Sequence, residues 1–510
     1  MSRFYTRRNI LLLASGGLAG LALSACGGSA ATSPVASTSS SAPAATASAP
    51  TTPATSSASI SSAASSSAGV QTSAATSSAA SSSAAAATTS SQAVARVAAA
   101  AGGTTIQWWD YNPTPDKLAN DFLAKQWSPD HPNLGIEIVT HAGNNIQAEE
   151  QLTVLLAGGT PPDLCDVPMS ENDLPSRGLS QPIDDLVSRD KYDLSRFNKS
   201  HIEDLAKYLG KLYSIPYSTG GNGYAMVYNR NMLAQAGIAE PSAKWEEAWS
   251  WPDFRDNLRR LTKGTGQQTT QAGLGDYGYY ILTIPIPYKA DWITPDLKTI
   301  ICDSPEMIQA YSDYLDLVLK DHTTEASPGV KLDSSGPTGA FGAGQTAIAT
   351  IGSWQLGDYA KLTKVDWAFM PTPKASVASP EFGPVFLGIA KGAKHRDQAW
   401  ELLKWLVDQG RYARYLGRPG ATKVDTEPML RDQFQNLPNV RWQVLLDEYD
   451  IAQPLPFIRR QPSWGPMSKL TDAAWKDLSQ GKQDVPTALK NLKTALQGIV
   501  DEYEKNKPAG

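Results

Sequence analysis

The sequence has few of the residues that most often bind metals or act as catalytic nucleophiles. It contains only 3 cysteines and 5 histidines in 510 residues, and no two histidines have the spacing of a zinc-ligand pair. We find no Gly-x-Ser-x-Gly elbow, no Walker loop and no paired-glycine dinucleotide fingerprint. These absences predict a non-enzyme that uses no metal or cofactor. A catalytic carboxylate pair leaves no such signature, so an exported glycan-acting enzyme stays an alternative.

The sequence also lacks an excess of positive charge. It carries 45 basic and 50 acidic residues, and every acidic residue lies after residue 103. A nucleic-acid partner requires a basic face that neutralises phosphates. We therefore expect no nucleic-acid partner.

Residues 27–103 lack aromatic residues, and Arg96 is their only charged residue. Ser, Ala and Thr dominate, and such a segment buries too little apolar surface to offset the entropy of ordering it. Together with Cys26 we expect a disordered tether over residues 26–103, which as a flexible coil would span about 50 Å. Glycosylation of its Ser and Thr residues is left open.

The apolar stretch of residues 10–23 is too short to span a membrane. Three arginines precede it and small residues follow it, which is typical of a signal peptide, here residues 1–25. Leu23-Ser24-Ala25-Cys26 resembles a bacterial lipobox, so Cys26 is expected to carry a lipid that anchors the protein to a membrane. The Arg7-Arg8 pair fits the twin-arginine route, and the ordinary Sec route fits equally well.

Residues 104–510 hold all 14 tryptophans and are long for one hydrophobic core, so two domains are expected. Cys165 and Cys302 are the two thiols of this part. They form either one disulfide outside the cytoplasm or two separately buried, inert thiols, and the strand-like surroundings of Cys165 favour the second alternative.

The folded part begins with alternating strand and helix patterns. We predict strands at residues 104–109, 135–140 and 162–167, with helices at 113–126 and 144–156 between them. This order predicts a mainly parallel sheet, which binds ligands outside the carboxyl ends of its strands. Further strands are predicted at 211–217 and 224–229, and helices at 245–261, 399–407 and 485–503.

Six segments resemble, in order, those of a known protein family. They are residues 155–163, 210–217, 227–238, 340–354, 391–406 and 481–489. The first places a small-residue turn before Pro162-Asp163, and the fourth ends in Gly352-Ser353-Trp354. Together they resemble the family 1 extracellular solute-binding proteins, the group that includes maltose-binding protein.

The resemblance implies an α/β protein with the two-lobe periplasmic-binding-protein fold. Lobe 1 would comprise residues 104–217 and 366–410, and lobe 2 residues 222–358 and 420–510, with crossovers near 217–222, 359–365 and 408–420. The ligand would sit in a cleft that closes by a hinge. The protein would then be the extracytoplasmic, monomeric substrate-binding subunit of an ABC importer, which passes a small polar solute to permease subunits. A surface lipoprotein without a transport partner is the second alternative.

A sugar site needs aromatic rings for the apolar sugar faces and polar groups for the hydroxyls. Trp354 and Trp464 match family positions that stack on sugar. The full set of expected ligand contacts is Trp354, Trp464, Trp108, Asp110, Asn112, Asn222, Tyr279 and Trp292. Four other tryptophans, Trp245, Trp249, Trp251 and Trp400, are expected in the core, and Tyr228 and Asn229 in structural roles.

The chain departs from the family near the first crossover. No acidic residue lies between Tyr217 and Tyr228, where the family often has an acidic ligand contact. The solute is therefore left open between a mono- or oligosaccharide and a polyol or glycerol phosphate, and Arg418 and Arg459-Arg460 keep the phosphate alternative open.

Overall fold

The computed structural model describes residues 94–110, 114–140, 145–167, 172–219, 226–275, 282–379, 383–451 and 461–507. The predicted signal peptide, Cys26 and most of the predicted tether lie outside these residues. All described residues belong to one structural unit of the chain. Within it, two main sheets organise the fold.

The first sheet has six strands in the order β1-β3-β2-β4-β12-β7. Their bounds are Val94–Val97 for β1, Thr104–Asp110 for β2, Leu134–Thr140 for β3, Leu164–Val167 for β4, Ser214–Ser218 for β7 and Val385–Ile389 for β12. As the alternating pattern predicted, β2 runs parallel to both β3 and β4. The strand β12 comes from much later in the chain, lies between β4 and β7, and is antiparallel to both.

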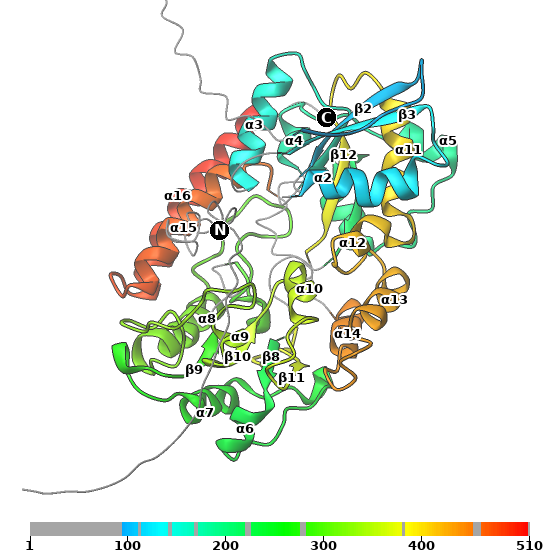
Figure 1. Ribbon diagram of the computed structural model, residues 1–510. Helices are drawn as coiled ribbons and strands as arrows, with labels where there is room; N and C mark the ends of the chain where they lie inside the picture. The colour runs from blue at the N-terminus through cyan, green and yellow to red at the C-terminus, as the bar shows by residue number, and fades with distance from the viewer. Residues whose placement is uncertain are drawn as a thin grey trace, which may run out of the picture. The chain divides into compact units, whose positions relative to one another are not determined.

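Helices and a short hairpin cover the first sheet. They are α2 (Pro115–Lys117), η1 (Leu118–Trp127), α3 (Asn145–Ala157), α4 (Asp173–Ser176), α5 (Asp184–Asp190), η2 (His201–Ala206), α11 (Arg396–Val407), η8 (Asp408–Gly410) and α12 (Arg411–Tyr415), with β5 (Lys207–Tyr208) paired to β6 (Lys211–Leu212). Figure 1 shows α2 and α11 beside this sheet. The rings of Phe122 on η1 and Trp405 on α11 lie 5.2 Å apart, so these two helices share one apolar layer.

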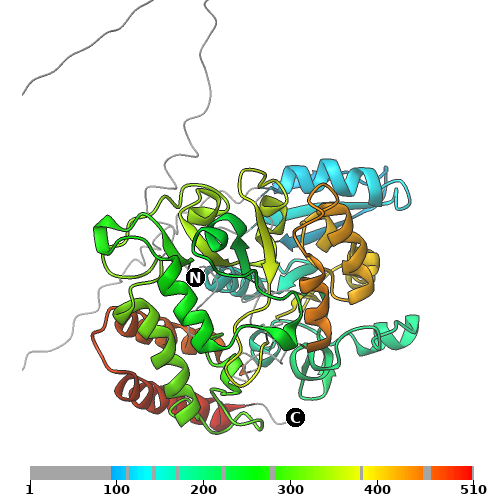
Figure 2. The ribbon, with the colours of Figure 1, turned by 90° about the horizontal axis from the view of Figure 1, so that it is seen from below.

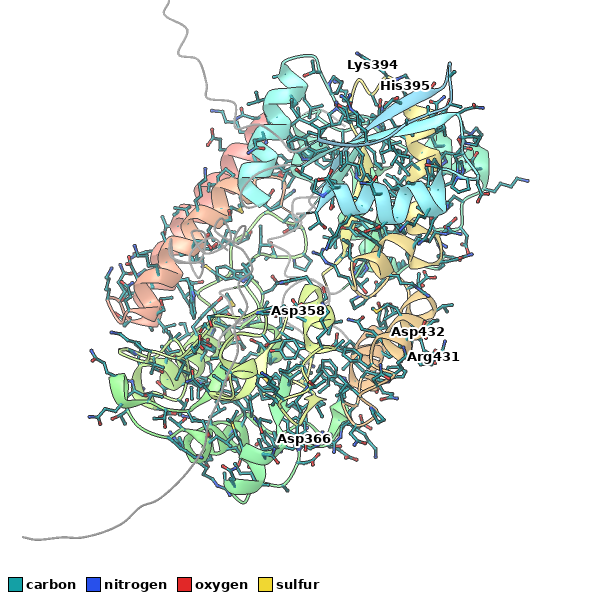
Figure 3. All side chains as sticks on the ribbon, in the orientation of Figure 1. Asp358, Asp366, Lys394, His395, Arg431 and Asp432 are labelled. Carbon is teal, nitrogen blue, oxygen red and sulfur yellow. The ribbon has the colours of Figure 1, made fainter. Side chains whose placement is uncertain are left out.

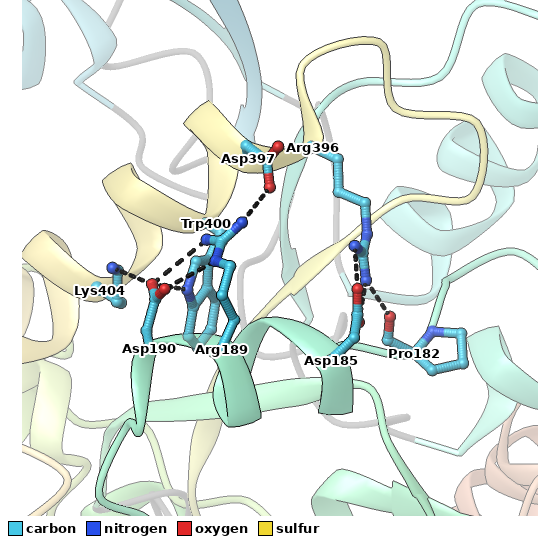
Figure 4. Close-up of polar contacts among 8 residues, drawn as sticks. All are labelled: Pro182, Asp185, Arg189, Asp190, Arg396, Asp397, Trp400 and Lys404. Carbon is cyan, nitrogen blue, oxygen red and sulfur yellow. Dashed lines mark hydrogen bonds and ion pairs between the residues drawn. The ribbon is translucent and has the colours of Figure 1, made fainter.

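A polar cluster fixes α5 against α11 (Figure 4). The Asp190 carboxylate accepts hydrogen bonds from the indole N–H of buried Trp400 at 2.8 Å and from Lys404 Nζ at 2.5 Å. One turn earlier, Arg396 donates two hydrogen bonds to Asp185, whose pKa falls to about 2 mainly because of them. The cluster therefore combines a contact to a buried donor with an exposed ion pair.

The second sheet has four strands in the order β11-β8-β10-β9. Their bounds are Met226–Asn229 for β8, Ala272–Gly275 for β9, Thr346–Thr350 for β10 and Trp367–Met370 for β11. The strand β10 is parallel to β9 and antiparallel to β8. Because β9 and β10 are parallel, they end at the same edge of the sheet, and the candidate site lies at this edge.

The other described helices pack around the second sheet or in a separate core next to it. They are α6 (Arg230–Gln235), η3 (Trp245–Glu247), α7 (Trp251–Leu261), η4 (Gly266–Gln268), η5 (Ile286–Tyr288), α8 (Pro305–Leu315), η6 (Asp316–Lys320), α9 (Gly339–Gly342), η7 (Ser353–Gln355), α10 (Leu356–Tyr359), α13 (Lys423–Gln433), α14 (Gln443–Ile451), α15 (Trp464–Ser479) and α16 (Val485–Asn506). Figure 2 shows the red helices α15 and α16 packed side by side next to green α8.

Side-chain caps explain where several of these helices begin. Asn229, Ser250 and Ser304 each accept a hydrogen bond from the backbone N–H three residues on. Each cap satisfies one of the N–H groups that a helix start leaves without a partner. The structural role expected for Asn229 is confirmed in this way, and Tyr228 donates to Glu240 at 2.6 Å.

The chain enters the first sheet earlier than the sequence indicates. The strand β1 pairs antiparallel with β3, and its Ala95 and Val97 side chains are buried in the core. The prediction that residues up to 103 form a tether is therefore wrong for residues 94–103. The sequence pattern that indicates β1 is an alternation in which Val94 and Arg96 face solvent. The Ser- and Ala-rich composition around it made this short alternation hard to recognise.

A second boundary also differs from the prediction. Residues 366–410 are expected in lobe 1, yet β11 pairs with β8 along its whole length and belongs to the second sheet. The chain therefore passes from the second to the first sheet between Met370 and Val385, not at residues 359–365. A four-residue, fully buried strand has no polar face that would show from sequence which sheet it joins.

Both thiols of the folded part are free and buried. Cys165 packs in the core of the first sheet, and Cys302 packs in a separate core around α8 and α16. Burial raises the pKa of the Cys302 thiol to about 12, and it raises that of Cys165 even further. The prediction of two separately buried, unpaired cysteines is confirmed.

Candidate functional site

Trp354 lies just beyond the carboxyl end of β10. Its side chain is partly exposed, and the turn η7 carries it. A Cβ atom on Gly352 would lie 2.5 Å from Cζ2 of Trp354, so the indole rests against backbone that only glycine leaves open. Gln355 stabilises this turn because its Oε1 accepts a hydrogen bond from the Gly352 N–H at 2.9 Å. The sequence thus presents a fixed aromatic plate at a strand end.

The neighbouring strand ends contain several predicted contacts that the structure does not describe. Residues 276–281, with Tyr279, follow β9 directly, and Asn112 and Asn222 also lie outside the described residues. Trp464 is the first residue of α15, but its side chain is likewise outside the description. Ligand contact by these four residues stays a prediction.

Asp110 and Asp166 lie side by side at the carboxyl end of the first sheet. The register pairs Trp109 on β2 with Cys165 on β4, so the next residue pair along these parallel strands is Asp110 and Asp166. Asp110 is 0% exposed and Asp166 is 4% exposed. Two carboxyl groups are thus buried at the end of the sheet where this class of fold binds ligands.

Each of these two carboxyl groups accepts a hydrogen bond from a tyrosine. Tyr412 Oη donates to Asp110 Oδ1 at 2.5 Å, and Tyr217 Oη donates to Asp166 Oδ2 at 3.1 Å. The two tyrosine rings lie 5.0 Å apart. We name Asp110, Asp166, Tyr217 and Tyr412 the carboxyl cluster. Sequence reasoning identified only Asp110, although Asp166 has the same place at the end of its own strand.

The electrostatics of the carboxyl cluster follow from burial. Burial raises the pKa of Asp166, and the negative charge of Asp110 raises it further. The hydrogen bond from Tyr217 and the positive charge of half-buried Arg418 oppose this increase. Burial likewise raises the pKa of Tyr217 and of Tyr412, so both hydroxyls stay protonated donors at neutral pH.

Two of the predicted aromatic contacts are in the core. Trp108 is 0% exposed and meets the Tyr412 ring edge-on at 5.0 Å, and Trp292 is 0% exposed beside Tyr311. The structure thus brings Trp108 and Asp110 together around Tyr412, whereas Trp292 packs in the separate core around α8 and α16. Contact of Trp108, Asp110 or Trp292 with a ligand stays a prediction.

The expected core tryptophans lie in the core or packed against it. Trp245, Trp251 and Trp400 are buried, which confirms the prediction for these three. Trp249 is partly buried and packs against the same core as Trp251.

The two segments that connect the sheets near residues 218 and 420 are paired with each other. Ser218 and Gly420 form an antiparallel bridge, and Ser218 Oγ donates to the Pro419 carbonyl at 2.7 Å. Thr219 Oγ1 donates to the Gly420 carbonyl at 2.8 Å, and Tyr449 Oη from α14 donates to the same carbonyl at 2.6 Å. We name Ser218, Thr219, Pro419 and Gly420 the crossover pair.

The opposite end of the first sheet carries the loop that follows β12. In Figure 3, Lys394 and His395 lie on the loop that follows β12, and the His395 backbone N–H donates to Asp163 Oδ1 at 2.9 Å. Asp163 precedes β4, so this loop lies at the end of the strand remote from Asp166. The carboxyl cluster and the crossover pair therefore mark the other end of the sheet.

Within the part of the chain that the structure describes, no three His, Cys, Asp or Glu side chains are grouped so as to hold a metal ion. The described helices include none with the length and apolarity required to cross a membrane.

Comparison with known families decides the identity of this fold. The profile of the bacterial extracellular solute-binding protein family matches residues 112–410, which is more than half of the chain. The chain belongs to this family. Among its relatives, the arabinooligosaccharide-binding protein of Bacillus subtilis is 23% identical to this solute-binding protein over 305 residues, which cover 58% of this chain and 68% of the relative.

Solved structures confirm the architecture of this solute-binding protein. An ABC substrate-binding protein from Listeria monocytogenes in complex with cycloalternan matches with a TM-score of 0.65 and 19% identity, over 78% of this chain and 99% of that one. UgpB from Mycobacterium tuberculosis in complex with glycerophosphocholine matches with a TM-score of 0.65 and 18% identity, over 79% and 99%. The predicted family and its two-lobe α/β fold are both confirmed.

Proposed function

We propose that this solute-binding protein is the substrate-binding subunit of an ABC importer and captures a mono- or oligosaccharide between its lobes. The observation that carries the proposal is Trp354, a partly exposed indole held against glycine at a strand end. An aromatic plate of this kind suits the apolar face of a sugar ring. One relative named for arabinooligosaccharide binding and one structure with bound cycloalternan support the same ligand class.

The proposed contact set combines this plate with polar groups. Trp354 stacks on the sugar, and Trp464, Asn112, Asn222 and Tyr279 supply a second plate and hydrogen bonds to hydroxyls. Trp108, Asp110 and Trp292 complete the proposed contact set, and because all three are 0% exposed, a ligand could reach them only if the surrounding side chains moved apart.

The proposed mechanism is a two-state closure around the crossover pair. An open form admits the solute to one lobe, and closing adds contacts from the other lobe. The ligand shifts the equilibrium by its greater affinity for the closed form. The paired segments at Ser218 and Gly420 suit such an axis because backbone pairing fixes where the two chains cross.

A specific observation favours one second candidate, a glycerol phosphate or related phosphodiester. Arg418 is half-buried next to the carboxyl cluster, and a guanidinium binds phosphate through paired, charge-assisted hydrogen bonds. The structure of UgpB with glycerophosphocholine matches as well as the cycloalternan complex does.

We also propose that the protein works outside the cytoplasm as a monomer, anchored through a lipid on Cys26, and delivers its solute to permease subunits. The order of basic residues, apolar stretch and lipobox supports the anchor. Metabolic labelling with a fatty-acid analogue tests it: the label should enter the native protein and be absent from Cys26→Ser. Equal labelling of both proteins would contradict the anchor.

A thermal-shift screen of the chain from residue 89 onward tests the ligand class. A solute that binds only the folded state raises the Tm, and the stabilisation grows with the logarithm of its concentration over Kd. We expect a shift with sugars, and with glycerol phosphates if the second candidate holds. Analysis of the retained solute then separates binding from turnover. No shift with any class, or steady product formation from an oligosaccharide, would overturn the proposal.

A further inference from the structure

The carboxyl cluster has a feature that its tyrosines do not explain. Each tyrosine hydroxyl donates to one carboxyl group, yet Asp166 Oδ1 has no hydrogen-bond partner among the described residues. Asp166 is only 4% exposed, so water offers little compensation. A buried carboxylate oxygen without a donor is costly, and native structures rarely leave one so.

The charges that face Asp166 come from several elements. Asp110 on β2 is the neighbouring acid, and Arg418, after α12, is the facing cation. The hydroxyl groups of Tyr217 and Tyr412 face both acids. The Tyr415 hydroxyl interacts with Asp110, and the Cys165 thiol interacts with Asp166. Among the residues that the structure describes, two ionised carboxyl groups would therefore face one guanidinium in largely dry surroundings. Like charges so placed do not both ionise readily.

We propose that Asp110 and Asp166 hold one proton between them at neutral pH and so form a proton-binding site within the lobe. Paired strands lie about 4.8 Å apart, so a proton on Asp166 Oδ1 becomes a hydrogen-bond donor toward the adjacent acid. The pair then carries a single negative charge opposite Arg418. The Asp166 oxygen that lacked a hydrogen-bond partner gains a partner. This site is separate from any particular solute, so it does not depend on the proposed function.

The location of the site connects the bound proton with the segments that join the two sheets. Tyr217 directly precedes Ser218, and Arg418 directly precedes Pro419, so the carboxyl cluster and its facing cation each adjoin one chain of the crossover pair in sequence. Loss of the proton would place a second buried charge beside these two chains. The stability of this region should therefore depend on external pH, to which a protein outside the cytoplasm is exposed.

The direction follows from linkage. The folded protein holds this proton more tightly than an unfolded chain does, because the pKa of Asp166 is raised by folding. The stability that the proton contributes is fully present below the unperturbed aspartate pKa of about 3.9, and it is lost as the pH rises through the folded pKa.

Infrared spectroscopy of the full chain with isotope-labelled aspartate tests the proposal directly. We expect the absorption band of a protonated carboxyl group at neutral pH, which weakens in mildly alkaline buffer and is absent from Asp166→Asn. Tyr217→Phe removes a hydrogen bond that favours the ionised form, so its band should persist to higher pH. A wild-type protein without the band at neutral pH would overturn the proposal, even if the variants fail to fold.

Thermal unfolding against pH gives a second, independent measurement. Asparagine mimics a protonated carboxyl group, so Asp166→Asn should have a higher Tm than wild type in mildly alkaline buffer, and the difference should shrink toward acid pH. The control, Asp185→Asn, removes an exposed carboxylate whose pKa is lowered, so it should not gain stability at alkaline pH. A Tm of Asp166→Asn below wild type at every pH would contradict a shared proton.

Discussion

At the scale of single residues, Trp354 is the side chain on which the proposed ligand contact depends most. Replacing it with alanine should weaken binding of the solute found in the screen by more than about 1 kcal/mol, because a buried aromatic contact is lost. This corresponds to a rise in Kd of about fivefold or more by calorimetry. Trp475→Ala is the matched control, since that partly buried indole on α15 packs on Tyr314. Unchanged affinity in a folded Trp354→Ala protein would remove Trp354 from the site.

Gly352→Ala tests the same contact with the tryptophan retained. Gly352 has a φ of −94°, which alanine adopts readily, so the variant changes space and not backbone preference. The new methyl group must displace the indole, and we expect weaker binding with intact secondary structure. Gly336→Ala is its control because no atom lies within 4 Å of the added Cβ. Equal affinities of the two variants would show that the position of the indole is unimportant.

The residue scale also shows where sequence reasoning stops. Asp110 could be assigned to a strand end because its strand pattern is local. Tyr412, which donates to it, lies 302 positions later, and no spacing rule connects the two. The same holds for Tyr217 and Asp166, which come from different strands. The burial of Trp108 could not be predicted from the sequence either, because a tryptophan near a strand end is compatible with both a core and a binding site.

At the scale of helices, Asp190 should be the critical residue between α5 and α11. Asp190→Ala removes the acceptor of the Trp400 indole N–H, and that indole is fully buried (Figure 4). A buried donor without an acceptor costs about 1–3 kcal/mol, so the free energy of unfolding should fall by that amount in a denaturant titration. Asp185→Ala should lose only about 0–1 kcal/mol, because its side chain is 66% exposed. Equal decreases in the free energy of unfolding for the two variants would contradict a greater role for Asp190.

The strand β1 leads to a prediction about where the folded part begins. A chain that starts at residue 104 lacks β1 and exposes the core beneath Ala95 and Val97. Burying one valine side chain is worth about 1.5–3 kcal/mol, so we expect an unfolding free energy lower by about 2 kcal/mol than that of a chain from residue 89. The exposed edge of β3 should also promote aggregation. Identical denaturation curves would show that β1 is dispensable.

Elements were predictable where a pattern was long and local. The alternating strands and helices between residues 104 and 167 were found because each strand or helix has its own periodicity, and Pro252 marked the start of α7. The predicted helix over 245–261 instead divides into η3 and α7, since Ser250 caps a new helix. Assignment of β11 to its sheet depended on its partner β8, which the local sequence does not specify.

At the scale of the whole molecule, the family was accessible because six short segments occur in a fixed order. Each segment marks a local structure, and only their order specifies the two-sheet topology. What the order did not specify was how the connections meet. The crossover pair joins residues about two hundred positions apart, through a backbone bridge that no side-chain motif announces.

The proposed closure should depend on that backbone pairing more than on the Tyr449 hydroxyl that supports it. Tyr449→Phe removes one donor to the Gly420 carbonyl and the hydroxyl contacts with Thr219 and Thr426, but Thr219 Oγ1 still donates to that carbonyl at 2.8 Å. We therefore expect an unfolding free energy lower by about 0.5–1.5 kcal/mol, with the solute-induced decrease in radius of gyration retained in X-ray scattering. Tyr213→Phe is the control, because the described residues give its hydroxyl no hydrogen bond. If Tyr449→Phe alone abolished the compaction, the side-chain contact from α14 would define the hinge, and the backbone bridge would be secondary.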